Sequence, residues 1–163
     1  MRRTIIGVMG PGAGARQEDL ATARRLGALL ARQGWAVLCG GRSAGVMDAV
    51  CRGAREAGGL TIGILPGEDP GDASEAVDVV IVTGMGSARN AINVLSSDLV
   101  IACGMGAGTA SEIALALKSG REVILLGDHR EARAFFRSLG KERVTVAGDP
   151  EEAIAIARRI LGP

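Results

Sequence analysis

Residues 99–112 read LVIACGMGAGTASE, an apolar run followed by a glycine-rich loop and the first residues of a helix-forming segment. The same order of apolar run, loop and Ala/Leu/Arg-rich segment recurs along the chain. Alternation of strands with helices is typical of a parallel sheet, because parallel strands need a crossover connection. The sequence therefore predicts an α/β fold of the Rossmann-like, doubly wound type.

We expect a mostly parallel sheet of about seven strands with helices on both faces. The run Val79-Val80-Ile81-Val82 is apolar at every position, which is typical of a strand buried on both faces. The expected strands are residues 4–9, 35–39, 60–65, 77–82, 99–102, 123–126 and 144–146. The expected helices are residues 18–33, 45–57, 87–95, 110–119, 130–139 and 150–161. Only residues 66–74 join two strands without an obvious helix.

Length and composition favour a single domain over residues 1–163. Of the 163 residues, 47% are hydrophobic, 2% are aromatic and 25 are glycine. Collagen needs glycine at every third position and disordered chains lack apolar residues, so both classes are excluded. The net charge of +1 and the scarcity of aromatic side chains argue against nucleic acid as a partner.

The cysteines, the histidine and the N-terminus limit which metal sites and which cellular compartment we expect. Cys39, Cys51 and Cys103 have neither the number nor the spacing of a disulfide framework or a zinc site. His129 is the only histidine, which excludes histidine triads and multi-histidine metal sites. No apolar stretch reaches the ~18 residues of a membrane span, and the start reads as a first strand rather than a signal peptide. We expect a cytoplasmic protein with no metal site and no membrane partner.

Glycine concentrates in four loops that follow expected strands, at residues 10–14, 40–45, 84–86 and 104–109. The carboxyl ends of parallel strands meet at one sheet edge, where α/β sheets bind ligands. Glycine lets N–H groups approach a ligand, and the following helix adds unpaired amides, so the loops predict a phosphate site. The alternative is that glycine merely permits tight turns. The candidate binding residues are Gly10, Gly40, Gly41, Ser43, Met85, Asn90, Gly106, Ala107, Gly108 and Thr109.

Arg89 and Glu112 are the candidate catalytic residues, because each falls in the first turn of a helix that follows a ligand-edge strand. A carboxylate can stabilise the oxocarbenium-like ribose of N-glycosidic cleavage, while a fixed cation anchors phosphate or the departing base. The alternative for Glu112 is a capping box with Thr109. A cation at a helix N-terminus opposes the helix dipole, so Arg89 indicates an anionic partner.

Arg89-Asn90 and residues 104–112 resemble the LOG family of nucleoside 5′-monophosphate phosphoribohydrolases, often misnamed lysine decarboxylases. Residues 40–47 are similar to that family's earlier glycine loop. The resemblance implies that Gly106, Gly108 and Thr109 hold the 5′-phosphate and that Glu112 acts on the ribose. It also implies a homodimer or homotetramer and no required cofactor. Lysine decarboxylation needs a pyridoxal-bearing lysine, and no lysine follows a ligand-edge loop, so that activity is excluded.

Departures from the family motif keep two functions open. Gly104, Met105, Arg42 and Asp48 replace motif residues, and the pattern is similar to a branch that includes molybdenum cofactor carrier proteins. The first function is N-glycosidic hydrolysis of a nucleoside 5′-monophosphate, which releases base and ribose 5-phosphate. The alternative is non-catalytic binding of a nucleotide or of the molybdenum cofactor. Both predict a phosphorylated small molecule as ligand, and the glycines favour binding more firmly than catalysis.

Overall fold

The computed structural model describes residues 2–162, so Met1 and Pro163, the two ends of the expected domain, lie outside the described residues. The strands are β1 Ile5–Met9, β2 Ala36–Cys39, β3 Thr61–Leu65, β4 Val79–Val82, β5 Leu99–Cys103, β6 Val123–Leu126 and β7 Val144–Ala147. The α-helices are α1 Gln17–Arg32, α2 Gly45–Glu56, α3 Arg89–Leu95, α4 Ala107–Lys118, α5 Arg130–Gly140 and α6 Pro150–Leu161. Short 3-10 helices are η1 Pro70–Asp72, η2 Gly86–Ala88 and η3 Lys141–Arg143.

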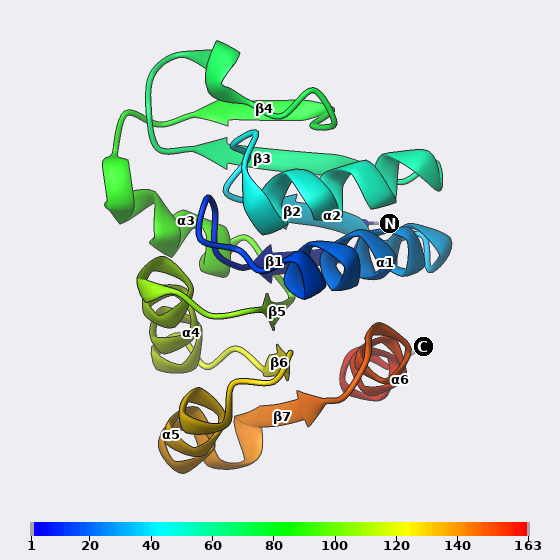
Figure 1. Cartoon of the computed structure of the whole chain (residues 1–163), viewed down its shortest axis with the longest axis vertical. Coiled ribbons are helices and arrows are strands. Elements are labelled where there is room, and N and C mark those ends of the chain that lie inside the picture. The colour runs from blue at the N-terminus through cyan, green and yellow to red at the C-terminus, as the bar shows by residue number, and fades with distance from the viewer. Residues whose placement is uncertain (1, 163) are drawn as a thin grey trace.

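The seven strands form one parallel sheet in the order β4-β3-β2-β1-β5-β6-β7. The chain starts at β1, runs outward to β4, and then crosses back to continue on the other side of β1 at β5 (Figure 1). This reversal is the topological switch point of doubly wound folds. The predicted α/β, Rossmann-like fold is therefore confirmed.

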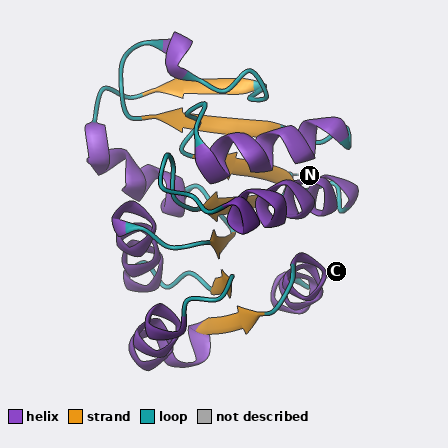
Figure 2. Cartoon of the chain, in the orientation of Figure 1, coloured by secondary structure: helices purple, strands orange, loops and turns teal. Residues whose placement is uncertain are grey.

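Helices lie on both sides of the sheet, as the purple ribbons of Figure 2 show against the orange strands. Side chains of α1, α2 and α6 form the apolar core on one face, and those of α3, α4 and α5 form the core on the other. The helices α1 and α2 pack closely because glycines lie at their contact. A Cβ atom on Gly53 would lie 1.9 Å from the carbonyl oxygen of Arg24, and one on Gly27 would lie 2.1 Å from that of Val50.

Strand β4 contradicts the expectation that it is buried on both faces. It lies at the edge of the sheet, and its four side chains are 37–45% exposed. The reason is the path of the chain, because α3 passes along β3 on its way back to β5 instead of crossing over β4. An apolar run indicates that a strand is covered on both faces, but what covers it need not belong to the same chain.

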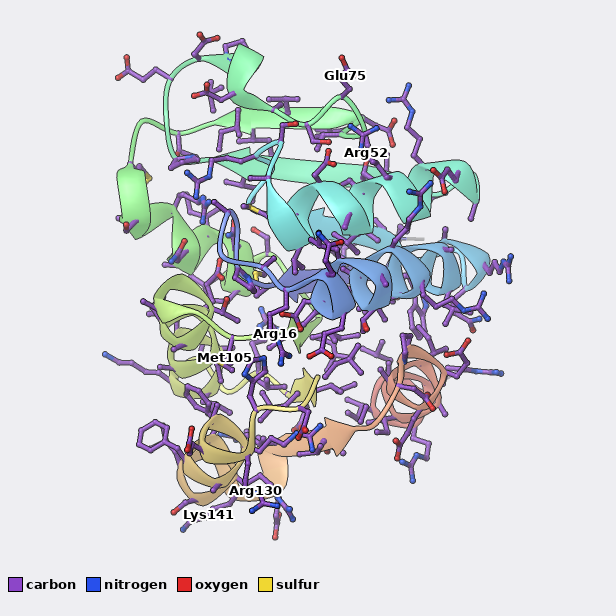
Figure 3. The ribbon with its side chains drawn as sticks, in the orientation of Figure 1. Arg16, Arg52, Glu75, Met105, Arg130 and Lys141 are labelled. Atoms are coloured by element: carbon purple, nitrogen blue, oxygen red, sulfur yellow. The ribbon has the colours of Figure 1, made fainter. Side chains whose placement is uncertain are left out.

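The segment between β3 and β4, which the sequence leaves without a helix, contains η1 and lies beside α2 and the loop after β2. Ser74 Oγ donates a hydrogen bond to Asp48 of α2 at 2.6 Å, and Arg55 of α2 donates to the carbonyl oxygen of Glu75. Figure 3 shows Glu75 of this segment near Arg52 of α2. Among residues 2–162, no helix has the length and apolarity to cross a membrane.

Candidate functional site

A cavity of about 500 Å³ opens at the carboxyl ends of the central strands, beside the switch point between β1 and β5. Its wall comes from the end of β1, from the loops after β1, β2, β3, β4 and β5, and from the first turns of α2, α3 and α4. The lining residues are Val8, Met9, Gly10, Pro11, Gly12, Gly14, Gly40, Arg42, Met47, Pro66, Gly86, Ser87, Arg89, Asn90, Gly106, Ala107, Gly108, Thr109 and Glu112. The volume suits a small organic ligand, and the wall combines apolar side chains with a few polar groups.

Most of the candidate residues meet at this cavity, including Arg89, Glu112 and the α4 residues, but Gly41, Ser43 and Met85 do not line it. Gly41 has a φ of +77°, and a Cβ atom on it would lie 3.0 Å from Gly63 of β3, so its role is to let two backbones approach. The N–H of Ser43 donates to the carbonyl oxygen of Asp72 at 3.4 Å. Met85 is 49% exposed.

The N-terminus of α4 supplies hydrogen-bond donors to the cavity. Its first intrahelical bond runs from the N–H of Ala110 to the carbonyl oxygen of Gly106 at 2.8 Å, so the N–H groups of Ala107, Gly108 and Thr109 come before it. Thr109 is 2% exposed, and its Oγ1 has no hydrogen-bond partner among residues 2–162. A buried hydroxyl without a partner costs about 1–3 kcal/mol. These donors, at the positive end of a helix dipole, are suited to the oxygen atoms of an anion.

Glu112 does not form the capping box that its spacing from Thr109 allows. The helix begins three residues earlier than the sequence predicts, so Gly106 is the N-cap and Thr109 lies within the first turn. Glu112 Oε1 instead accepts a hydrogen bond from Asn93 Nδ2 at 2.8 Å and lies 3.7 Å from Arg89 Nη1. The glutamate therefore joins α4 to α3 at the wall of the cavity.

Arg89 and Glu112 form a buried ion pair, with side chains 9% and 8% exposed. Burial lowers the pKa of Arg89, while the charge of Glu112 acts in the opposite direction. Burial also raises the pKa of Glu112, against the hydrogen bond from Asn93 and the charge of Arg89. Arg89 Nη1 donates to Asn90 Oδ1, but Arg89 Nε has no partner among the described residues. The guanidinium thus keeps a free donor beside the cavity.

Asn90 connects the two helices that carry the ion pair. Its Nδ2 donates to Ser111 Oγ at 3.0 Å, and Ser111 Oγ in turn donates to the carbonyl oxygen of Gly108 at 2.7 Å. This chain of hydrogen bonds fixes the first turn of α3 against the first turn of α4. Asn90 therefore positions the site through protein contacts, in addition to lining the cavity.

Arg42 lines the cavity, although in the sequence it stands out only as a departure from the glycine-loop motif of the LOG family. Its backbone pairs with Ala73 of the β3–β4 segment, and the N–H of Ser74 donates to the carbonyl oxygen of Gly41 at 2.8 Å, so this segment holds the loop after β2. The Arg42 guanidinium lies near Gly12 of the loop after β1. No carboxylate lies within 4.0 Å of it among residues 2–162. The cavity thus has two guanidinium groups and one carboxylate, which favours an anionic ligand.

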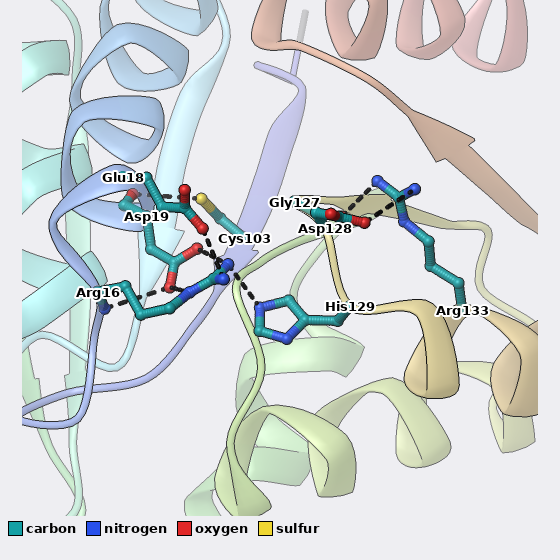
Figure 4. Close-up of polar contacts among 8 residues, drawn as sticks. All are labelled: Arg16, Glu18, Asp19, Cys103, Gly127, Asp128, His129 and Arg133. Carbon is teal, nitrogen blue, oxygen red and sulfur yellow. Dashed lines mark hydrogen bonds and ion pairs between the residues drawn. The ribbon is translucent and has the colours of Figure 1, made fainter.

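The loop after β1 is anchored by Asp19 in the first turn of α1 (Figure 4). The Asp19 carboxylate accepts hydrogen bonds from the backbone N–H and the guanidinium of Arg16, which also lies 3.0 Å from His129 Nε2. Burial acts to raise the pKa of Asp19, but the hydrogen bonds from Arg16 outweigh it and lower that pKa. A Cβ atom on Gly104 would lie 2.9 Å from Asp19 Cγ, which explains glycine where the motif has proline.

Neither the cysteines nor the acidic residues form a metal site in the described part of the chain. No group of three or more His, Cys, Asp or Glu side chains is placed to hold a metal ion among residues 2–162. Cys39 and Cys51 are buried thiols with their sulfur atoms 3.5 Å apart, beneath the loop after β2. A metal ion in this cavity would therefore need ligands other than a cluster of His, Cys, Asp and Glu side chains from the described residues.

Comparison with known proteins gives a family and several solved structures. Residues 3–154 match the model of the SLOG cluster4 family. A protein of Archaeoglobus fulgidus, described as uncharacterized, is 44% identical over 126 residues, which are 77% of this chain and 82% of that protein. The segment that matches the family model, residues 3–154, includes the four glycine loops, Arg89 and Glu112 of this chain.

Two solved structures are similar over nearly the whole chain. The molybdenum cofactor binding protein from the phototrophic bacterium Rippkaea orientalis is 52% identical, with 99% of each chain covered and a TM-score of 0.98. The molybdenum cofactor carrier protein MCP from Chlamydomonas reinhardtii is 52% identical, with 98% of this chain and 99% of that chain covered and a TM-score of 0.94. These likenesses confirm the resemblance that the motifs around Arg89 and Glu112 indicate.

Proposed function

This chain belongs to the SLOG cluster4 family, and from that membership and the donors of the cavity we propose that it binds the molybdenum cofactor as cargo, without chemical change. The solved structures described above include a binding protein and a carrier protein for this cofactor. The single observation in this chain that carries the proposal is the buried Oγ1 of Thr109. It has no protein partner and lies beside the free amides of α4.

The chemistry of the cargo fits the residues that line the cavity. The cofactor combines a flat pterin ring system, a phosphate and a metal held by the sulfur atoms of the pterin itself. We assign the phosphate to the N–H groups of Ala107, Gly108 and Thr109 and to the hydroxyl of Thr109. Met9 and Met47 offer adaptable apolar surface to a flat ring. Because the metal arrives with its own ligands, a cluster of protein ligands is not required.

Retention of the cofactor tests this proposal directly. Purified protein is mixed with molybdenum cofactor released from a molybdoenzyme and passed through a desalting column. Molybdenum in the protein fraction is then measured by mass spectrometry, and pterin by fluorescence after oxidation. We expect molybdenum and pterin to elute with the protein in equal amounts, with at least tenfold less retained by Thr109→Val.

The matched control is Thr145→Val, which makes the same change at a half-buried threonine of β7, outside the cavity lining. We expect this variant to retain the cofactor like the wild-type protein. No retention by the wild-type protein, or equal loss in both variants, would contradict the proposal.

A second candidate function is hydrolysis of a nucleoside 5′-monophosphate, favoured by the position of Glu112 and Arg89 on the cavity wall. Glu112 would act on the ribose and Arg89 would anchor the phosphate or the departing base. The substitution Glu112→Gln separates the two functions. It would abolish release of base and ribose 5-phosphate from a panel of monophosphates. A carrier would keep its ligand, because removal of a negative charge makes the cavity more positive.

A further inference from the structure

Arg42 and the N-terminus of α4 lie on opposite sides of the loop after β1. Arg42 follows β2, whereas α4 follows β5, and β1 lies between these two strands in the sheet. Neighbouring strands are about 4.8 Å apart, so the ends of β2 and β5 are separated by about 10 Å. Contacts of the loop show the same order, because Pro11 lies beside Gly106 at the start of α4 and Gly12 lies beside the Arg42 guanidinium.

The Arg42 guanidinium is positioned at the cavity but is not neutralised by the protein. The backbone of Arg42 pairs with Ala73, and its exposed side chain lines the cavity. None of the ion pairs among residues 2–162 includes this guanidinium. Arg52 of the neighbouring α2, by contrast, pairs with Asp48 at 2.7 Å. The positive charge of Arg42 is therefore available to a ligand in the cavity.

Arg42 and Arg89 influence each other across the cavity that both of them line. Burial lowers the pKa of Arg89, the charge of Glu112 opposes this, and the positive charge of Arg42 adds to the lowering. An anionic group between two guanidinium groups is attracted by both of them. The phosphate that we assign to the first turn of α4 lies on the other side of the loop after β1. The arrangement therefore favours a ligand with a second anionic group, apart from its phosphate.

We propose that Arg42 binds the oxygen ligands of the molybdenum atom, and that it thereby selects the metal-loaded cofactor over its metal-free form. This inference rests on the proposed function, because the metal is part of the cargo. In the loaded form, the molybdenum carries oxygen ligands in addition to the two sulfur atoms of the pterin, and this end of the cofactor is anionic. A guanidinium forms strong, charge-assisted hydrogen bonds with such oxygen atoms. In the metal-free form, the same end carries two thiols, which are weak acceptors.

The other contacts of the cavity cannot make this distinction. The two forms share the phosphate and the pterin ring, so the amides of α4, the hydroxyl of Thr109 and the apolar surface of Met47 serve both equally. Selectivity is a difference between two affinities, and only a residue that faces the metal end changes it. Loss of the Arg42 guanidinium therefore weakens binding of the loaded form more than binding of the metal-free form.

The test compares the dissociation constants of the two forms under anaerobic conditions. Loaded cofactor is released from a molybdoenzyme, and metal-free cofactor from the same enzyme purified from cells grown without molybdate. Both are titrated near pH ~6.5, where thiols with the ordinary pKa of about 8.5 are protonated. Bound pterin is measured by fluorescence after desalting and oxidation. We expect the wild-type protein to bind the loaded form at least tenfold more tightly, and Arg42→Gln to reduce this preference to less than threefold.

The matched control is Arg158→Gln, which removes the same charge at an exposed arginine of α6 outside the cavity lining. It should keep the wild-type preference. Equal binding of both forms by the wild-type protein, an equal loss of both in Arg42→Gln, or loss of the preference in the control would overturn this inference and leave the proposed function standing. Binding of neither form by the wild-type protein would instead contradict the proposed function itself.

The salt dependence of binding to the wild-type protein gives a second measurement that needs no substitution. Salt screens interactions between exposed charges, and Arg42 is exposed. The dissociation constant of the loaded form should therefore rise more steeply with sodium chloride concentration than that of the metal-free form. The phosphate is common to both forms, so its contribution cancels in the comparison. Equal slopes would overturn the inference even if Arg42→Gln failed to fold.

Discussion

The Arg89 guanidinium and the Glu112 carboxylate lie 3.7 Å apart at the contact between α3 and α4, and Asn93 Nδ2 donates to the same carboxylate oxygen at 2.8 Å. Helix α3 follows β4 and helix α4 follows β5, and these two strands lie on opposite sides of β1 in the sheet. The ion pair therefore connects the two halves of the fold. Breaking one partner of a buried pair leaves a charge without compensation. The pair is therefore expected to matter for stability as well as for the ligand.

The stability of the protein should depend on pH through Glu112. Burial raises the pKa of Glu112 above 4.5, so the folded state binds this proton more tightly than the unfolded chain. The free energy of unfolding should therefore fall as the pH rises from 4.5 through the raised pKa. Urea unfolding of wild-type protein and Glu112→Gln across this range measures the effect, and the fall should be smaller in the variant. The pKa values of Asp19, Asp48 and Asp98 are lowered from 3.8, so these groups act below this window. Identical pH profiles for both proteins would contradict the expectation.

The coupling between Arg89 and Glu112 should appear in a double-mutant cycle. Arg89→Met leaves the carboxylate buried without its cation, which should cost about 3–5 kcal/mol of unfolding free energy. Adding Glu112→Gln to this variant removes the unpaired charge and should recover part of the loss. The measurement is urea unfolding of the wild type, both single variants and the double variant. Additive losses would show that the two side chains do not interact.

Removal of the Thr109 hydroxyl should stabilise the fold but weaken the binding of the ligand. Thr109→Val keeps the shape of the side chain and removes a buried hydroxyl without a partner, so unfolding should become harder by about 1 kcal/mol. A phosphate ligand loses one donor, so its dissociation constant should rise about tenfold. Thermal unfolding and ligand titration measure the two effects. A variant that is both less stable and unchanged in binding would assign Thr109 a purely structural role.

The sequence allowed much of the fold to be predicted, because strand–loop–helix alternation is a local pattern. The strand order is set by long-range packing, so the edge position of β4 could not be read from an apolar run such as residues 79–82. Gly10, Gly40 and Gly106 lie in three different glycine loops and all line the cavity, because parallel strands end at a common edge.

Other features of the site depend on tertiary contacts that no local spacing reveals. Because α4 begins at Ala107, Thr109 is not its N-cap and forms no capping box with Glu112. Glu112 instead accepts a hydrogen bond from Asn93. Arg42 lines the cavity because the β3–β4 segment holds its loop, and that segment is distant in sequence. A signal for Arg42 was present, since it stands in a glycine loop at the ligand edge.

The contact between α1 and α2 should be intolerant of a single methyl group at Gly53. A Cβ atom there would lie 1.9 Å from the carbonyl oxygen of Arg24, and a helix backbone cannot move aside as a flexible side chain can. Overpacking typically costs about 1–3 kcal/mol, and we expect Gly53→Ala to reach the upper end.

The control for Gly53→Ala is Gly14→Ala, because a Cβ atom at Gly14 would have no heavy atom within 4 Å and the residue is exposed. The control should be neutral or stabilise the fold by about 0.4–1 kcal/mol, since alanine restricts the unfolded chain. Urea unfolding of both variants gives the comparison. A loss of less than 1 kcal/mol for Gly53→Ala would mean that α1 and α2 can separate at little cost. The contact between α1 and α2 would then contribute too little energy to fix α2, and with it the loop of Gly40 and Arg42, at the cavity.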